Sequence, residues 1–181
     1  MPDIDHPGPR IYVADLAAYN TGILHGRWVD LNIDTTVDEV REAIRAMLHD
    51  TPVTPPEVAE EYAIHDYEGF HGYELDEYEA LETVVSVATF IAEHGELGAE
   101  LVNMSDDVDD ARHSLEERYA GSGESLTAWA ETYAEDTGQL DEIPERWHPY
   151  IDFERYSRDL ELGGDINVRD VGGEVHVFWA G

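Results

Sequence analysis

The sequence predicts an α+β fold in three consecutive segments, residues 1–72, 73–121 and 122–181, and a chain of this length could form one domain or two or three small ones. Three patterns support this prediction. Apolar residues alternate in the first segment as in strands, recur at helical spacing in the second, and form a glycine-turned hairpin pattern at the end of the third. With 42% apolar and 10% aromatic residues, the chain is too hydrophobic to be a disordered acidic tail.

The first segment is predicted to contain two strands, a helix and a third strand. The strands are expected at the beginning of RIYVADLAAYN, in GRWVDLNI and in EYAIHDYEG, where apolar residues alternate with polar ones. Thr36 and Glu39 have the spacing of a capping box, which predicts the start of a helix. That helix is expected to end before a proline-rich stretch, because proline removes a backbone donor. Together these elements make a small α+β domain.

The second segment is predicted to be helical. Apolar residues recur at helical spacing from Leu75, and Gly95 is a natural helix end. Two more helices are expected in ELGAELVNM and DDVDDARHSLEERYAG, the last ending at Gly121. These helices share an apolar side, so their outer side should be strongly acidic.

The third segment is predicted to begin with a flexible link, GSGE, and to continue as a second α+β domain. Ser125 can cap a helix, and Pro144 can begin a further helical segment. A last helix should end at Gly163–Gly164. The alternating residues on either side of Gly172–Gly173 predict a hairpin with a two-residue glycine turn.

The net charge of the chain is extreme. It has 42 acids, 10 arginines and no lysine, which gives a formal charge of −32. Residues 46–111 alone hold eighteen acids and no arginine. Like charges one helical turn apart destabilise a helix by about 0.2–0.5 kcal/mol per pair. The acids are therefore either compensated by the environment or needed by a partner.

Composition also excludes several classes of protein. The chain has no cysteine, which excludes disulfides and a thiolate metal site. No apolar stretch is long enough to cross a bilayer, and the start of the sequence lacks the features of a signal peptide. An acidic surface repels nucleic acid and anionic membranes and attracts basic partners. We therefore expect a cytoplasmic protein that binds neither nucleic acid nor membranes.

Catalytic and metal-binding motifs are weak. His65, Asp66 and Glu68 could form an acid/base group, but a strand with side chains on alternate faces is the simpler interpretation. The stretch DDVDDARHSLEE lacks the alternating ligands and central glycine of a calcium loop. We expect no metal site, and a small hydrolase using His65 and Asp66 stays an alternative function.

Two explanations account for the acids. Adaptation to high salt would give an acidic, lysine-free chain, which would then be a salt-adapted binding domain with some other basic partner. The second explanation is mimicry of DNA, which carries one negative charge per roughly 1.7 Å of duplex axis. An excess of 32 charges corresponds to about 16 base pairs, and a dimer to about 32. The concentration of acids in residues 46–111 favours mimicry, because salt adaptation should spread them evenly.

Several blocks of the sequence resemble the ArdA-type antirestriction proteins, in order, along nearly the whole chain. The blocks are RIYVADLAAYNTGILHGRWVDL, YAIHDYEGF, FIAEHGELGAEL, ARHSLEERYAG and YIDFERYSRDLELGGDI…GEVHVFW. The resemblance implies a DNA mimic, carried on mobile genetic elements, that occupies the DNA-binding path of the methyltransferase core of type I restriction–modification enzymes. It also implies three small consecutive domains, residues 1–72, 73–121 and 122–181, in an elongated, curved chain, a homodimer formed through the C-terminal domain, no catalytic activity and no cofactor.

The resemblance places the mimic surface on acids of the matching blocks, and the charge pattern adds others. The matching blocks contribute Asp66, Glu68, Glu93, Glu96, Glu100, Glu116 and Glu117. The charge pattern adds Glu74, Asp76, Glu77, Glu79, Glu82, Asp106, Asp107, Asp109 and Asp110. We call these sixteen residues the predicted acidic set. Two strongly negative chains can associate only through an apolar or arginine-bearing patch, which we expect in residues 122–181.

Overall fold

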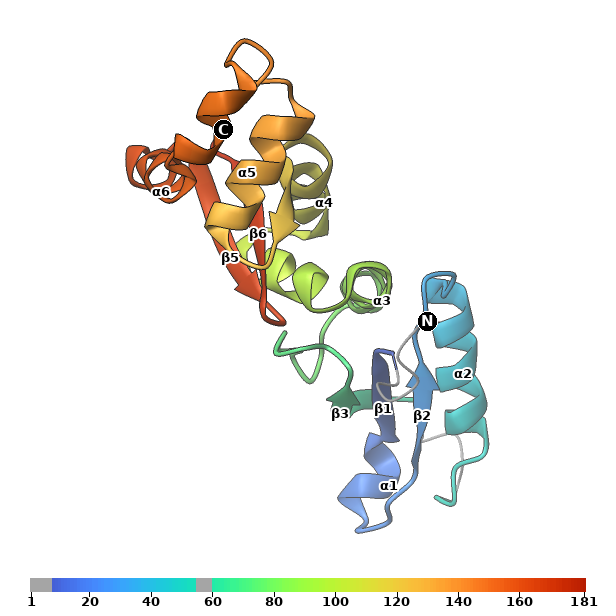
Figure 1. Cartoon of the computed structure of the whole chain (residues 1–181). Helices are drawn as coiled ribbons and strands as arrows, with labels where there is room; N and C mark the ends of the chain where they lie inside the picture. The colour runs from blue at the N-terminus through green and yellow to red at the C-terminus, as the bar shows by residue number, and fades with distance from the viewer. Residues whose placement is uncertain (1–7, 55–59) are drawn as a thin grey trace. The chain divides into compact units, whose positions relative to one another are not determined.

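The computed structural model describes residues 8–54 and 60–181. The chain divides into two compact units, Met1–Val108 and Asp109–Gly181, each containing a three-stranded antiparallel sheet (Figure 1). The predicted α+β class is therefore confirmed, whereas the division into three domains stays a prediction. None of the helices in the described ranges is long and apolar enough to cross a membrane.

The sheet of the first unit has the order β2-β1-β3. Its strands are β1 (Arg10–Asp15), β2 (Gly26–Asp30) and β3 (Tyr62–Glu68), which confirms the three predicted strands. The predicted second strand is shorter than expected, since Ile33 lies beyond its end and is 61% exposed. A short helix, α1 (Leu16–Asn20), follows β1 and was not predicted.

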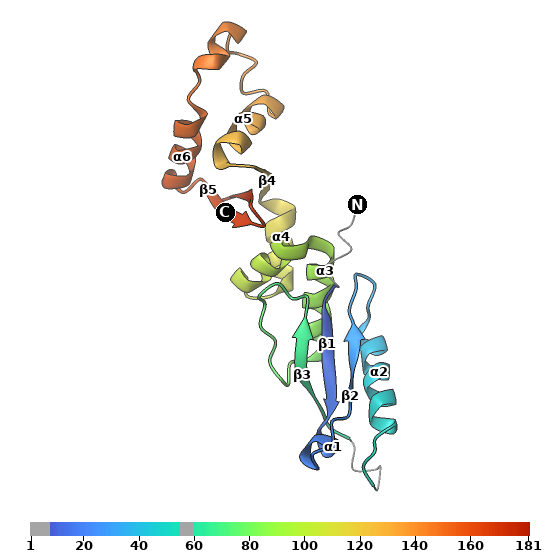
Figure 2. The same ribbon diagram turned by 60° about the horizontal axis from the view of Figure 1, so that its bottom comes forward.

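Helix α2 (Val37–His49) begins with the predicted capping box and lies alongside β2 (Figure 2). The Glu39 amide donates to the Thr36 hydroxyl at 3.3 Å, and the Thr36 amide donates to the Glu39 carboxylate at 2.8 Å. These bonds satisfy amides that a helix start leaves free. The helix ends before the proline-rich stretch as predicted, although Pro55 and Pro56 lie outside the described residues.

The Thr36→Ala substitution is expected to lower the free energy of unfolding by about 1 kcal/mol at neutral pH. The Thr36 amide and then its hydroxyl lower the pKa of Glu39 by hydrogen bonding to its carboxylate. The pKa of Glu39 is thus lower in the folded state than in the unfolded state. The stabilisation that the bonds between Thr36 and the Glu39 carboxylate give is therefore present above the ordinary carboxyl pKa, and it is lost as pH falls through the folded-state pKa of Glu39. Urea unfolding at several pH values measures the loss. An unchanged midpoint at neutral pH would contradict the role of the box.

Helix α3 (Leu81–Met104) is interrupted at Gly95, whose backbone is non-helical with φ 60° and ψ −140°. The predicted end at Gly95 is thus confirmed as a break between two helical halves. The predicted helix start at Leu75 is wrong, because residues 75–80 form an irregular connection with a turn at Glu77 and Tyr78. In this connection the Glu77 carbonyl accepts a hydrogen bond from the Ile64 amide of the edge strand β3, at 2.9 Å.

The sheet of the second unit has the order β4-β6-β5, after helix α4 (Val108–Glu117). Strand β4 (Tyr119–Gly123) lies where the sequence predicted the end of a helix and a flexible link, so both predictions are wrong. Pairing with β6 (Glu174–Trp179) holds this glycine-rich stretch extended, since Gly121 lies opposite Val177. A sheet partner distant in sequence overrides the local preference.

The remaining elements of the second unit follow the prediction closely. Helix α5 (Leu126–Asp136) is capped by Ser125, and α6 (Phe153–Gly163) ends at Gly164 with φ 78°. The segment after Pro144 is a 3₁₀ helix, η2 (Glu145–Tyr150). Strand β5 (Ile166–Val171) pairs with β6 through the predicted glycine turn, in which φ is 62° and 85°. The two helices α5 and α6 pack against each other, and buried residues of α5 meet the sheet.

Candidate functional site

Most of the predicted acidic set is exposed to solvent. Fourteen of its sixteen members are exposed, and only Glu79 and Glu100 are half-buried. Twelve members lie in the first unit and four in the second, namely Asp109, Asp110, Glu116 and Glu117. The structure thus presents most of these carboxylates to solvent, as binding a partner requires.

Residues 73–80, which we call the acidic segment, are held on the edge of β3. The Ile64 amide bonds to the Glu77 carbonyl at 2.9 Å, and the Asp76 carboxylate accepts from the Tyr78 amide at 3.0 Å. The second bond makes an Asx-turn, a local conformation that aspartate favours. The segment exposes Glu74, Asp76 and Glu77 on a backbone fixed by the neighbouring strand.

His65 lies between the acidic segment and α1. Its Nε2 is 3.6 Å from a carboxylate oxygen of Glu77, and its ring is 4.7 Å from that of Tyr19. The register of β3 against β1 shifts here, since Tyr12 faces Asp66 and Val13 faces Ile64, leaving His65 as the extra residue of a bulge. The bulge sends His65 toward Glu77 and Tyr19.

The alternative acid/base pair is not formed in this structure. The Asp66 carboxylate accepts a hydrogen bond from the next backbone amide, that of Tyr67, at 2.8 Å. His65 instead has Glu77 as its carboxylate neighbour. The two residues named for a hydrolase therefore have separate structural roles, in a bulge and in a local turn.

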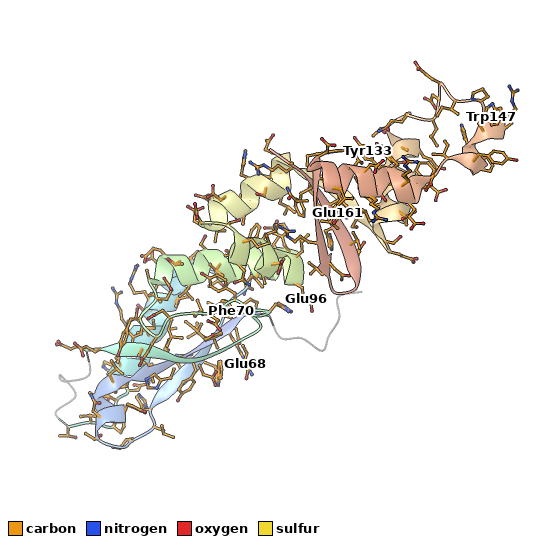
Figure 3. The ribbon with its side chains drawn as sticks, turned by 90° about the vertical axis from the view of Figure 1, so that its left-hand side faces the viewer. Glu68, Phe70, Glu96, Tyr133, Trp147 and Glu161 are labelled. Atoms are coloured by element: carbon orange, nitrogen blue, oxygen red, sulfur yellow. The ribbon has the colours of Figure 1, made fainter. Side chains whose placement is uncertain are left out.

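Arginine compensates for particular members of the set. Arg10 donates to Glu68 at 2.8 Å, at the end of β3 (Figure 3), and Arg41 donates to Glu82 at 3.1 Å. Arg41 also binds Asp38, so it joins α2 to α3. Because Glu68 and Glu82 are each paired with an arginine, they add less to the negative potential of the surface than unpaired carboxylates would. Ten arginines cannot offset 42 acids, and the excess of 32 negative charges persists.

Histidines accompany the acids on either side of the Gly95 break in α3. His94 lies 3.6 Å from the Glu93 carboxylate, and His71 lies 3.8 Å from that of Glu96. His71 has a positive φ of 48°, which is uncommon for a residue other than glycine. Glu96 is thereby placed near the turn that leads from β3 into the acidic segment (Figure 3).

Tyr73 and Tyr62, which lie beside acids, remain neutral phenols at physiological pH. Burial raises the pKa of Tyr73, and the charge of Glu79 raises it further. Burial also raises the pKa of Tyr62, with an opposing effect from Arg41 and a further increase from Glu82. The negative charge of this surface consequently comes from carboxylates alone.

The stretch that loosely resembles a calcium loop covers all of α4 and the two residues before it. Asp109 and Asp110 occupy the first turn of that helix, where negative charge is favoured by the helix dipole. Within the described ranges, no three histidine or acidic side chains are arranged to hold a metal ion. The arrangement supports electrostatic binding of a cationic partner as its chemistry.

Sequence reasoning could not show which acids have arginine partners. Arg10 and Glu68 are far apart in the chain, as are Arg41 and Glu82, and each pair is brought together only by the fold. The same is true of the contact between Tyr19 and His65. Spacing along a single helix or strand carries no signal for any of these contacts.

The fold and this surface define a class of protein: a small acidic α+β protein whose exposed carboxylates far outnumber its cations. The model of one family, described as antirestriction protein (ArdA), matches residues 11–174, so the chain belongs to the ArdA antirestriction family. A search of curated proteins gave no significant match. Members of the family are non-enzymatic inhibitors, and membership implies an antirestriction function directed at restriction–modification enzymes.

Proposed function

We propose that the predicted acidic set imitates the phosphates of DNA and competes with DNA for the binding path of type I restriction–modification enzymes, at the methyltransferase core. The observation that supports this most directly is the exposure of fourteen of the sixteen acids in a chain with only ten arginines. Enzymes that hold DNA neutralise phosphates with lysine and arginine. Exposed carboxylates on a fixed backbone meet the same cations.

The acidic segment supports this proposal because its backbone is held in place. Its carboxylates stand on a backbone tied to β3, so little conformational freedom is lost when they bind. Rigid placement matters because duplex phosphates are themselves regularly spaced. An acidic tail without structure would lose more entropy for each contact that it forms.

We further propose a homodimer formed through residues 122–181. Trp147 is 53% exposed and Tyr150 is 79% exposed, both in η2, and the guanidinium of Arg146 lies 5.8 Å from the Trp147 ring (Figure 3). This is an aromatic patch with an arginine, the kind of surface through which two acidic chains can associate. A dimer would carry as much negative charge as about 32 base pairs of DNA.

The purified protein is expected to displace a labelled duplex from a type I methyltransferase core at 0.1 M salt, and to do so progressively less well as salt rises. A log–log plot of inhibition constant against salt concentration measures the effect. For DNA itself the slope is about 0.9 per phosphate contact, so several contacts make affinity fall steeply.

Circular dichroism across the same salt range is the control for that assay. A salt-adapted protein should unfold at low salt, whereas a mimic should stay folded there and bind most tightly. A salt-independent inhibition constant, or no displacement at any salt at which the protein is folded, would exclude electrostatic competition for that enzyme.

A further inference from the structure

The longest stretch of the chain without aspartate, glutamate or arginine is residues 16–26. The next longest, residues 83–92, is mostly buried in α3. Residues 16–25 instead form α1 and an exposed loop that leads to Gly26, the first residue of β2, and in them Tyr19 is 52% exposed, Ile23 41% and Leu24 86%. We call these three residues the apolar loop patch. Single exposed apolar residues are ordinary, but a cluster of them in an acidic protein indicates a contact surface.

The loop that bears this patch is held in one conformation. The amides of Thr21 and Ile23 both donate to the Ala18 carbonyl at 3.0 Å. The His25 ring bonds to the Met47 carbonyl near the end of α2 at 2.8 Å, and the His25 carbonyl accepts from the Asp15 amide at 2.9 Å. Leu24 is therefore exposed next to a residue that is anchored at both its backbone and its side chain.

Two buried features anchor the same loop from within. Asp15, with no exposed surface, caps α1 by accepting from the Ala18 amide at 3.1 Å and also accepts from the Thr51 hydroxyl. A Cβ at Gly26 would lie 2.4 Å from the Val13 carbonyl oxygen, so only glycine fits there. These contacts fix an apolar surface that contributes little to the core, and a pre-organised surface of this kind binds with a small entropic cost.

The apolar loop patch adjoins the acidic segment through Tyr19. The Tyr19 ring meets the His65 ring at 4.7 Å, and His65 in turn lies 3.6 Å from Glu77. A partner seated on the carboxylates of the acidic segment therefore lies beside Tyr19, and Ile23 and Leu24 follow Tyr19 after a turn in which the Gly22 amide donates to the Tyr19 carbonyl at 2.9 Å.

We propose that the apolar loop patch contacts an apolar surface on the same restriction–modification enzyme that the acidic set binds, beside its DNA-binding path. This proposal rests on the proposed function. A second copy of the chain is the less favourable occupant, because the first unit has 24 acids against four arginines and a like unit would repel it. A cationic enzyme surface attracts the flanking acids instead.

The apolar contact would make binding specific for one class of enzyme, which charge alone does not do. Electrostatic binding is shared by every protein with a cationic DNA cleft, whereas an apolar contact requires a matching surface on the partner. Burial of apolar surface also does not depend on counterion release. The patch should accordingly supply a salt-insensitive part of the affinity and a preference among DNA-binding enzymes.

The test is the double substitution Ile23→Ser with Leu24→Ser, in displacement of a labelled duplex from a type I methyltransferase core. The inhibition constant should rise about tenfold, equivalent to about 1.4 kcal/mol, and the slope against salt should stay unchanged because no charge is altered. The matched control is Ile33→Ser, which removes a 61% exposed isoleucine elsewhere in the same unit and should leave the constant unchanged.

Each outcome decides between the proposals. If the wild-type protein displaces DNA with a salt-dependent constant but the double variant does so equally well, the apolar contact is wrong and the proposed function stands. If the wild-type protein does not displace DNA, the proposed function fails first. Sedimentation of both proteins identifies self-association: an oligomer that the double variant loses would overturn the enzyme as the occupant. Thermal unfolding confirms that the double variant is folded.

Discussion

Neutralising the acidic segment is expected to weaken inhibition by about 100-fold at 0.1 M salt. The variant carries Glu74→Gln, Asp76→Asn and Glu77→Gln, three exposed acids on a backbone tied to β3. For DNA, each phosphate contact raises the binding constant by about 0.9 log units when salt falls tenfold. Three contacts therefore raise the binding constant by about 500-fold between 1 M and 0.1 M salt, and this is the most that losing them should cost at 0.1 M. A protein surface condenses fewer counterions than a duplex, so the expected loss is smaller than this limit.

The substitutions preserve the structure that positions the segment. Asparagine at position 76 can still accept the Tyr78 amide through its side-chain oxygen, and the bond from Ile64 to residue 77 uses the backbone carbonyl. The substitutions do alter the contact between Glu77 and His65. Loss of inhibition would therefore report charge rather than unfolding, and removal of like charge should leave the stability of the unit unchanged or raised.

A second variant with the same change in charge shows whether inhibition depends on where the acids lie or only on the total charge. Glu131→Gln, Glu135→Gln and Asp136→Asn remove three exposed acids of α5 that lie outside the predicted acidic set. If total charge alone governs inhibition, both variants should lose the same amount, and the proposed mimic surface would be refuted. A loss confined to the first variant, with a smaller slope against salt, is the expected result. Displacement of a labelled duplex at four or more salt concentrations measures both quantities.

The sequence predicts those elements whose causes are local. The Thr36 capping box, the Ser125 cap, the break at Gly95 and the hairpin at Gly172–Gly173 all depend on residues within a few positions of one another, and the structure confirms each. Local signals of this kind keep their meaning in the folded chain because tertiary contacts do not compete with them.

The errors occur where a distant partner decides the conformation. Residues 75–80 continue the apolar spacing of α3, yet they form an irregular connection with a turn, bonded to the edge of β3 through the Glu77 carbonyl. Residues 119–123 contain two glycines and little apolar pattern, yet they form β4 because β6 lies beside them. The Trp129 indole supports this strand by donating to the Ala120 carbonyl at 2.9 Å. Neither partner is visible in the spacing of the residues themselves.

The acidic surface was predictable in composition and only partly in detail. A net charge of −32 and the exposure of most acids follow from composition, because ionised carboxylates are rarely buried. Among the residues that the structure describes, the fully buried acid is Asp15, which caps a helix that the sequence did not predict. Which acids have arginine partners depends on contacts between segments far apart in sequence.

The largest expected effect on stability follows from Trp129→Ala, which should lower the free energy of unfolding of the second unit by about 3–5 kcal/mol. Trp129 is only 2% exposed and lies in the buried cluster with Ala130, Ile166 and Val177. Its ring stacks on Tyr133 at 5.2 Å. The substitution removes this packing and also leaves the Ala120 carbonyl without the indole donor.

A loss of this size approaches the whole stability of a small folded unit, which is commonly about 5–15 kcal/mol. Urea unfolding followed by circular dichroism should show a lower midpoint, with an early transition if the two units unfold separately. The matched control is Trp147→Ala, which truncates a tryptophan that is 53% exposed and should change the unfolding free energy by less than about 1 kcal/mol. Equal losses of unfolding free energy in the two variants would show that the burial of Trp129 does not stabilise the second unit.

The Trp129→Phe substitution separates the packing of the ring from its hydrogen bond. Strand β4 is held both by β6 and by the indole of Trp129. Phenylalanine should restore most of the packing but not the hydrogen bond, so the unfolding free energy of Trp129→Phe should lie between those of the wild-type protein and Trp129→Ala.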